Sequence, residues 1–391
     1  MREKPSFYVA LTPIIFMMIV LVVGIGVMGW PASVCLLISA AFSCIIAMAK
    51  LKYTWDEIQG FIIDKISAVM APVLIVIFVG FMVATWSYAG TLPMLVYYGM
   101  LLVAPAWLYA IAFFLNAVLS YVSGASWGSV ASIGVALMGI GSGLHADLPI
   151  LAAAIVTGAY FGDKLSPLSD TTNLTSAVTK TKLYDLIKYL LWTTIPSTII
   201  SLLFFTWLGM IHTSTGSISP ESMQMLVQLK ELYKFGLLPL LPMLIVLCFT
   251  FLRLPTVPAL LSSAFVAVLV GWLYQGFPLA EGIKATMSGF RLTMITDSTT
   301  LLPSVKELLE QGGLNNQGGF LSFIICAMMF AGILTGTGMM DVTLQSAANK
   351  IKSAFGAILA SGVLAIIINL LTGSDGLNKI VISELMMKKF E

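Results

Sequence analysis

Two carboxylates and several hydroxyls are concentrated in one polar stretch of an otherwise apolar chain, Gly162-Asp163-Lys164-Leu165-Ser166-Pro167-Leu168-Ser169-Asp170-Thr171-Thr172-Asn173. Pro167 lacks an amide donor and disfavours a helical conformation at Ser166, so we expect a break in the helix here. Unwound backbone at membrane depth is tolerated only where protein buries it or where it lines a watery cavity. Its carbonyl, carboxylate and hydroxyl oxygens are the hard ligands that a small cation such as Na+ prefers.

The ion-binding residues predicted in this stretch are Asp163, Ser166, Ser169, Asp170, Thr171, Thr172 and Asn173. A carboxylate at such a site holds either a proton or Na+, and its environment sets the pH at which the two exchange. This competition is sufficient for cation/proton antiport, and we expect Asp170 to carry the exchanged ion and Asp163 to assist. The alternative is an ordinary solvated loop, which the nearby Lys180 and Lys182 favour for the later residues. Lys164 either neutralises a carboxylate or extends to the membrane interface.

A second polar break is expected around Ser123-Gly124-Ala125-Ser126-Trp127-Gly128. Its G-x-S-x-G pattern also occurs in serine hydrolases, but a nucleophilic serine needs a nearby base. The only histidines, His145 and His212, lie at predicted loop ends. An intramembrane serine hydrolase is therefore a distant alternative, and we predict no enzyme. We favour a broken helix lining the same cavity, with Ser123 and Ser126 as further ligands. Asn116 either hydrogen-bonds across this break or cements helix packing.

The composition requires that membrane helices position these residues. Of 391 residues, 59% are hydrophobic and 10% are charged, with a mean hydropathy of +0.98. Soluble domains carry roughly 25% charged residues, so soluble enzymes, disordered chains and nucleic-acid binders are excluded. The net charge of +2 gives no case for a polyanionic partner. We predict an all-α polytopic membrane protein in contact with the lipid bilayer.

About 20 apolar residues cross the hydrocarbon core as a helix. This length predicts spans at Phe7–Trp30, Pro31–Ala49, Ala68–Ala89, Tyr189–Ile211, Phe235–Leu252, Thr256–Tyr274, Phe320–Thr337 and Phe355–Leu371. The interval Leu92–Gly162 is broken by Pro105, by the Ser123–Ser126 segment and by Gly139, Gly141 and Gly143, and is expected to hold three or four further segments. Scattered cysteines at positions 35, 44, 248 and 326 indicate packing residues, and no cofactor is predicted. Lysines after the second span predict that both ends of the first hairpin are cytoplasmic.

Similarity between the two halves predicts a duplicated membrane domain, with a first repeat at 31–180 and a second at 256–391. Each copy begins with a Pro-Ala span and continues with an amphipathic stretch, Trp55–Ile66 or Leu279–Phe290. The segment around Gly80 aligns with that around Gly332. Asn116 and the Ser123–Ala125 segment of the second polar break align with Asn369 and Thr372–Ser374. We predict that Asn369, Thr372 and Ser374 contribute a second-repeat site. Chance similarity between two apolar sequences is the alternative.

The run Gly158–Asn173 resembles the signature of the NhaC-type sodium/proton antiporters, and Gly124–Gly128 and Asn369–Ser374 resemble flanking elements of that family. The resemblance extends over nearly the whole chain. It implies an inverted-repeat transporter with discontinuous helices that exchanges Na+ for H+ in a prokaryotic plasma membrane. Some similar proteins exchange malate for lactate with Na+ and H+, and the sequence does not separate these substrates. A homodimer is also left open.

The chain departs from this family near its end. In the family, a second discontinuous helix with a Ser-Pro-Leu-Ile-Pro-Trp-Asn-like run follows the Asn-Leu-Leu-Thr-Gly-Ser element, whereas this sequence ends at Glu391 before such a run. The counterpart of Gly158–Asn173 in the second repeat would also fall beyond Glu391. We therefore expect the second repeat to be incomplete and the 391-residue chain alone not to catalyse exchange.

Overall fold

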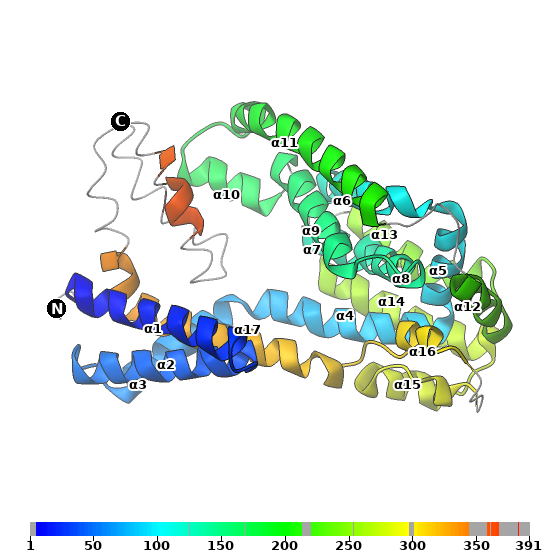
Figure 1. Cartoon of the computed structure of the whole chain (residues 1–391), viewed down its shortest axis with the longest axis horizontal. Coiled ribbons are helices and arrows are strands. Elements are labelled where there is room, and N and C mark those ends of the chain that lie inside the picture. Colours follow the sequence, from blue (N-terminus) through cyan, green and yellow to red (C-terminus); the bar gives the residue numbers. More distant parts are fainter. Residues whose placement is uncertain are drawn as a thin grey trace. The chain divides into compact units, whose positions relative to one another are not determined.

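The computed structural model describes residues 5–124, 126–167, 169–212, 220–252, 254–296, 301–343, 358–359, 361–366 and 382. Every regular element among these residues is a helix, which confirms the predicted all-α class. Within them, seven helices are long and apolar enough to cross a membrane, and an eighth candidate joins Trp55–Ala68 with Val73–Ala89. The chain is thus a multi-pass membrane protein. Figure 1 shows its helices in the colours of the sequence.

The helices fall into two compact units, and the first contains residues of Met1–Val73, Ala177–Lys180 and Gly318–Glu391. Its helices are α1 (Phe7–Gly26), α2 (Ala32–Ala49), α3 (Trp55–Ala68) and α17 (Gly318–Gly336). Thr54, the residue before α3, caps this helix. Its side chain accepts a hydrogen bond from the backbone amide of Glu57, and the side chain of Glu57 accepts one from the backbone amide of Thr54. On α17, Gly332 lies against the backbone of α3 and Gly336 lies against the ring of Phe61. The absence of side chains at these two positions lets α17 approach α3 closely.

The second unit contains residues of Leu74–Ser176 and Thr181–Gln317. Its first half contains α4 (Met70–Ala89) from Leu74 on, α5 (Thr91–Leu102), η1 (Pro105–Trp107), α6 (Leu108–Ser123), α7 (Ser126–Ser129), the π-helix η2 (Val130–Gly134), α8 (Val135–Gly143), α9 (Leu148–Leu165) and α10 (Asp170–Val178) up to Ser176. Its second half consists of α11 (Leu183–His212), α12 (Pro220–Leu232), η3 (Leu238–Leu240), α13 (Leu241–Phe251), α14 (Thr256–Val270), the π-helix η4 (Gly271–Gln275), α15 (Leu279–Ser288), η5 (Leu292–Met294), α16 (Pro303–Leu309) and η6 (Asn315–Gln317).

Most predicted spans correspond to helices of the structure. The spans at 7–30, 31–49, 68–89, 189–211, 256–274 and 320–337 correspond to α1, α2, α4, α11, α14 with η4, and α17. The interval 92–162 contains α5, α6, the α7–η2–α8 series and most of α9, which confirms the prediction of three or four segments. The predicted span at 355–371 lies outside the described residues except for 358–359 and 361–366.

Three details of the span prediction were wrong. Helix α1 ends at Gly26 instead of Trp30, because Gly29 adopts a left-handed conformation with φ 66° and Pro31 follows. The segment at 235–252 forms only the 3 residues of η3 and the 11 of α13, and prolines early in each prevent a longer helix. Gly139 and Gly141 do not interrupt α8, since both are buried within it.

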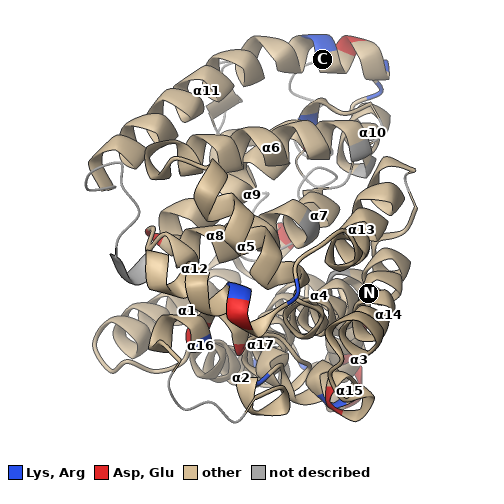
Figure 2. Ribbon diagram, turned by 90° about the vertical axis from the view of Figure 1, so that its right-hand side faces the viewer, with Lys and Arg blue, Asp and Glu red and all other residues tan. Residues whose placement is uncertain are grey.

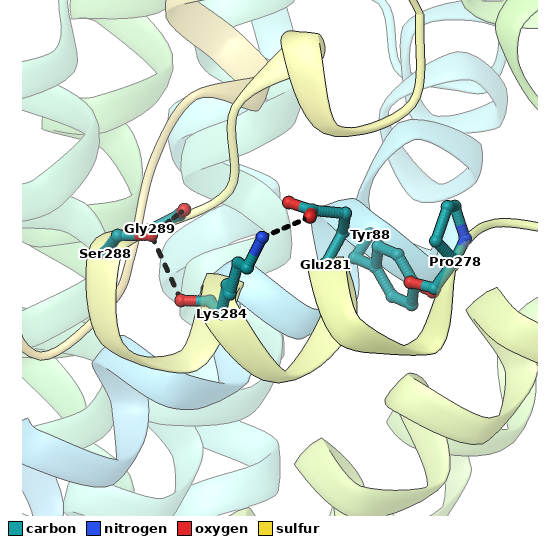
Figure 3. Close-up of polar contacts among 6 residues, drawn as sticks. All are labelled: Tyr88, Pro278, Glu281, Lys284, Ser288 and Gly289. Atoms are coloured by element: carbon teal, nitrogen blue, oxygen red, sulfur yellow. Dashed lines mark hydrogen bonds and ion pairs between the residues drawn. The ribbon is translucent and has the colours of Figure 1, made fainter.

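In the second unit, α4 packs against the turn between η4 and α15. Tyr88 of α4 is fully buried, and its hydroxyl donates a 2.8 Å hydrogen bond to the carbonyl oxygen of Pro278 (Figure 3). Gly271 and Gly282 leave room for the ring. The exposed side of α15 carries a 2.6 Å ion pair between Lys284 and Glu281.

The compact units do not follow the predicted repeat boundaries. In the first unit, α17 from the second predicted repeat packs on α2 and α3 from the first. In the second unit, α4 from the first predicted repeat packs with residues of α14 and α15 from the second in one hydrophobic core. The assignment of repeats to 31–180 and 256–391 stays a prediction.

Candidate ion-binding site

The site is built on the helix pair α6 and α9, which lie side by side in the second unit (Figure 1). Gly158 and Gly162 of α9 press against the backbone of α6, and a Cβ atom at either would clash with the carbonyl oxygens of Phe113 and Ala117. This confirms the expectation that the two glycines allow close packing. Because Asp163 follows Gly162 directly, this backbone contact fixes the position of Asp163 relative to α6.

The helix breaks where Pro167 predicts it, between Leu165 at the end of α9 and Asp170 at the start of α10. The break is shorter than the polar run, since Thr171, Thr172 and Asn173 are already helical. The hydroxyl oxygen of Ser169 accepts hydrogen bonds from the amides of Thr171 (3.2 Å) and Thr172 (3.4 Å). This cap restarts the helix immediately after the break.

A buried cluster of oxygens forms at the break. Asp163 is only 5% exposed and Ser169 is fully buried. The hydroxyl of Thr171 donates to Oδ2 of Asp163 at 3.2 Å, and its oxygen lies 2.9 Å from the Ser169 hydroxyl oxygen. A carboxylate and two hydroxyls are thus brought together as hard oxygen ligands. Ser166, which is close to these residues in sequence, is also fully buried.

Two other predicted ligands hold the turn. The hydroxyl of Thr172 donates to the carbonyl oxygens of Asp163 (3.3 Å) and Lys164 (3.1 Å). The side-chain amide of Asn173 donates to the carbonyl oxygens of Pro167 (3.1 Å) and Ser169 (2.8 Å). The carbonyl oxygens of Asp163 and Ser169 also accept backbone amides, from Ser166 and Asn173 (3.0 Å each). The side chains therefore add to the backbone bonds that hold the turn. Lys164 is exposed.

The second break lies at Gly124, which ends α6 in a left-handed conformation with φ 68°. Asn116 is fully buried, and Oδ1 of its side chain accepts a 3.0 Å hydrogen bond from the hydroxyl of Ser129, beyond the break. Of the two roles considered for Asn116, the structure therefore supports a bond across the break. Ser126 is half-buried at the start of α7.

Several predicted site residues lie outside what the structure describes. The backbone of Asp170 begins α10 and that of Ser123 ends α6, but their side chains are not described. Asn369, Thr372 and Ser374 of the predicted second-repeat site fall outside the described residues altogether.

The sequence of this chain is similar to those of known antiporters. The sequence model of the Na+/H+ antiporter family matches residues 158–390. A Haemophilus influenzae protein named as an uncharacterised Na+/H+ antiporter is 38% identical over 92% of this chain and 76% of its own length. The Na+/H+ antiporter NhaC of Alkalihalophilus pseudofirmus is 32% identical over 89% of the chain and 73% of its own. The chain belongs to the Na+/H+ antiporter family.

A third relative of this antiporter widens the range of substrates in the comparison. The malate-2H+/Na+-lactate antiporter of Bacillus subtilis is 30% identical over 82% of this chain and 67% of its own length.

Membership of a transporter family confirms that the chain is not an enzyme and gives the G-x-S-x-G pattern at 124–128 no catalytic role.

Charged residues are sparse along the helices (Figure 2). Charged side chains are rarely buried unless they are paired, so the burial of Asp163 indicates a specific role. The sequence pattern predicts Asp163, Ser169 and Thr171 as site residues but does not identify Ser129 as the partner of Asn116. The available signal was a hydroxyl soon after the Gly124 break, but only the packed helices show which hydroxyl reaches back.

Proposed function

We propose that the chain is a secondary active antiporter that exchanges Na+ for H+ across the membrane. The observation that carries this proposal is Asp163, a buried carboxylate held by Thr171 at a break between two helices of an antiporter-family protein. Ionisable groups within membrane segments are expensive to bury and are functional by default. The carboxylate is neutral with a proton bound and negative when the proton leaves, so H+ and Na+ compete for it.

We propose that Asp170 carries the exchanged ion and that Asp163 assists, with the hydroxyls of Ser166, Ser169, Thr171 and Thr172 tuning selectivity. Neutral oxygens adjust the size and field of a cation site without adding charge. We assign Asn173, Asn116, Ser123 and Ser126 to the same cavity, and Asn369, Thr372 and Ser374 to its second-repeat side. The support for Asp163, Ser169 and Thr171 is their hydrogen-bonded cluster, while the other assignments rest on the sequence.

The test is collapse of a pH gradient in proteoliposomes when Na+ is added, with choline as the control cation. Exchange by the 391-residue chain supports the function and contradicts the expectation that a further segment is needed. If exchange occurs only after a family-like C-terminal segment is appended, the result supports both the function and the expectation that a further segment is needed. If neither form moves protons in response to Na+, the proposed function is wrong.

Replacement of the predicted ion carrier gives the sharpest variant. Asp170→Asn should abolish Na+-dependent proton movement in the exchanging form while leaving the protein inserted, because an amide cannot exchange a proton for a cation. Asp185→Asn is the matched control, since Asp185 is an exposed carboxylate in the first turn of α11. Exchange at the parent rate in Asp170→Asn would reject Asp170 as the carrier.

A second candidate function is Na+-coupled exchange of organic acids. It is favoured by the similarity to the malate-2H+/Na+-lactate antiporter of Bacillus subtilis. Repeating the gradient assay with malate on one side and lactate on the other separates the two functions. Proton movement that requires an organic acid would replace Na+/H+ exchange with this function.

We also propose that the protein resides in a prokaryotic plasma membrane and forms a homodimer. The first proposal is supported by the bacterial relatives. Fractionation of cell membranes tests the location. Light scattering of the purified protein, with the detergent contribution subtracted, tests the dimer, and a monomeric mass would reject it.

A further inference from the structure

A cavity of about 330 Å³ lies within the second unit, away from the break that holds Asp163. It is lined by residues of α4, α5, the π-helix η2, α8, α9 and α16 and is partly open. Cavities of about 300–1,000 Å³ are typical of small-molecule sites. A π-turn such as η2 in the wall is also a frequent feature of functional sites.

Most residues that line this cavity are aliphatic. They include Leu92 of α5, Val135 and Met138 of α8, Ile155 of α9 and Leu308 of α16. Such walls offer no ligands to replace the water around Na+, so a bare or hydrated inorganic cation would not be stabilised among them. They are suited to a ligand with an apolar body.

Three polar side chains line the cavity: Ser142 of α8, which is half-buried, and Glu307 and Gln311, which form its exposed end. Glu307 and Gln311, on and just after α16, both line the cavity and are both exposed. Charged residues avoid the hydrocarbon core, so this end of the cavity faces water or lipid headgroups. The amide of Gln311 already donates a 2.9 Å hydrogen bond to the carbonyl oxygen of Glu307. This leaves the carboxylate of Glu307 and the carbonyl oxygen of Gln311 to accept hydrogen bonds at the entrance.

Acceptors at the entrance select the charge of a ligand. No Lys or Arg is among the described residues that line the cavity, so an organic anion would meet the Glu307 carboxylate without a compensating charge. An ammonium or guanidinium group presents only donors and carries the opposite charge. The cavity therefore favours a cation over the organic acids considered above.

We propose that this cavity binds a small organic cation, with an ammonium or guanidinium group at Glu307 and Gln311 and a short aliphatic body along Leu92, Met138 and Ile155. The site is distinct from the ion site on the same helix. Ile155 precedes Asp163 by eight residues, which corresponds to about 12 Å along α9. The proposal does not depend on Na+/H+ exchange.

The test is calorimetric titration of the chain in lipid nanodiscs with butylguanidinium, with empty nanodiscs subtracted. Pentanol and pentanoate are the neutral and anionic probes of similar length. We expect saturable binding of butylguanidinium that is at least tenfold tighter than that of either probe. Absence of saturable binding, or equal binding of pentanol, would overturn the proposal.

Two variants locate the ligand. Glu307→Gln keeps the size of the side chain and should weaken butylguanidinium binding at least tenfold. Glu231→Gln is the matched control, because Glu231 is an exposed carboxylate of α12 that does not line the cavity, and it should change binding less than twofold. Ala152→Leu should fill the cavity from α9 and also abolish binding. Parent affinity in either Glu307→Gln or Ala152→Leu would contradict the assignment, whatever the exchange assay shows.

Discussion

The two helix breaks of the second unit are bridged by different chemistry. At Gly124, a left-handed glycine separates α6 from α7, and two neutral side chains, Asn116 and Ser129, hydrogen-bond across the gap. At Pro167, the gap between α9 and α10 is bridged by the hydroxyl of Thr171 and the carboxylate of Asp163. Both breaks begin on the same backbone-to-backbone helix pair, α6 and α9.

This difference separates a break at which two neutral side chains pair with each other from one that holds a buried carboxylate. The amide oxygen of Asn116 and the hydroxyl of Ser129 are complementary and neutral, so their bond is complete without a third species. A carboxylate changes charge when a proton leaves, and its buried form then gains from a cation. We therefore expect the Pro167 break to control Na+ binding and the Gly124 break to contribute mainly to stability.

The largest effect is expected from the shared helix pair. Gly162→Ala places a methyl group against the carbonyl oxygen of Ala117, forces α6 and α9 apart and should cost about 1–3 kcal/mol of the free energy of unfolding. Both breaks would shift, so Na+ binding should be lost as well. Thermal unfolding in detergent and Na+ titration measure the two effects.

Gly60→Ala is the matched control for this change, because a Cβ at Gly60 of α3 meets open space. It should be neutral or raise stability by up to about 1 kcal/mol, since alanine is the better helix former. Equal stability of the two variants would show that the contact between α6 and α9 is less tight than described.

Asp163→Asn should have the next largest effect and act on one break only. Removing the charge should weaken Na+ binding about tenfold or more, because hydrogen bonds and contacts to charged groups contribute about 1.5–3 kcal/mol. Calorimetric titration with NaCl against choline chloride measures the affinity. Asp147→Asn on the same helix is the control, since Asp147 caps α9 at the amide of Ile150 and asparagine caps equally well. Unchanged Na+ affinity in Asp163→Asn would remove the distinction between the two breaks.

Thr171→Val should have a smaller effect on the same break. It removes the hydroxyl that donates to Asp163 while keeping the shape of the side chain, and should lower Na+ affinity about threefold to tenfold. Thr175→Val is the control one turn along α10, where the hydroxyl donates to the Thr171 carbonyl oxygen at 2.8 Å. Na+ titrations that show equal losses for both variants would mean that the helix, and not the hydroxyl at Asp163, determines affinity.

Ser129→Ala should have the smallest effect and act on the neutral break. Loss of its bond to Asn116 should cost about 0.6–1 kcal/mol of stability. Na+ affinity should change less than twofold, since the side-chain oxygen of Asn116 remains in place. A large loss of Na+ affinity would instead show that the bond between Ser129 and Asn116 holds Na+ ligands of the proposed cavity in position.

Local chemistry explains how much of this fold and site could be predicted from the sequence. Apolar segments such as 32–49 and 256–275 are long enough to cross a membrane, and this alone requires helices because lipid offers no partners to the backbone. Pro167 predicts a break because it lacks an amide donor and restricts the residue before it. Gly158 and Gly162 indicate a close helix contact because they carry no side chain.

Other features depend on neighbours that are distant in sequence. Gly139 and Gly141 could equally have broken α8, but in the structure they are helical and buried where a Cβ would meet Leu92 of α5 or Leu151 of α9. Ser129 is one of several hydroxyls after Gly124, and the packing of α6 decides that it bonds to Asn116.

The sequence by itself determined that the protein is an all-α membrane protein with a helix break that carries two carboxylates. Both features follow from local properties, the length of apolar segments and the backbone geometry of proline. Tertiary structure alone decided that Thr171 bonds to Asp163 while Thr172 and Asn173 bond to backbone carbonyls. These three neighbours have similar hydrogen-bonding groups, so sequence does not rank them. Their roles differ because α10 restarts directly after Ser169 and points successive side chains in different directions around its axis.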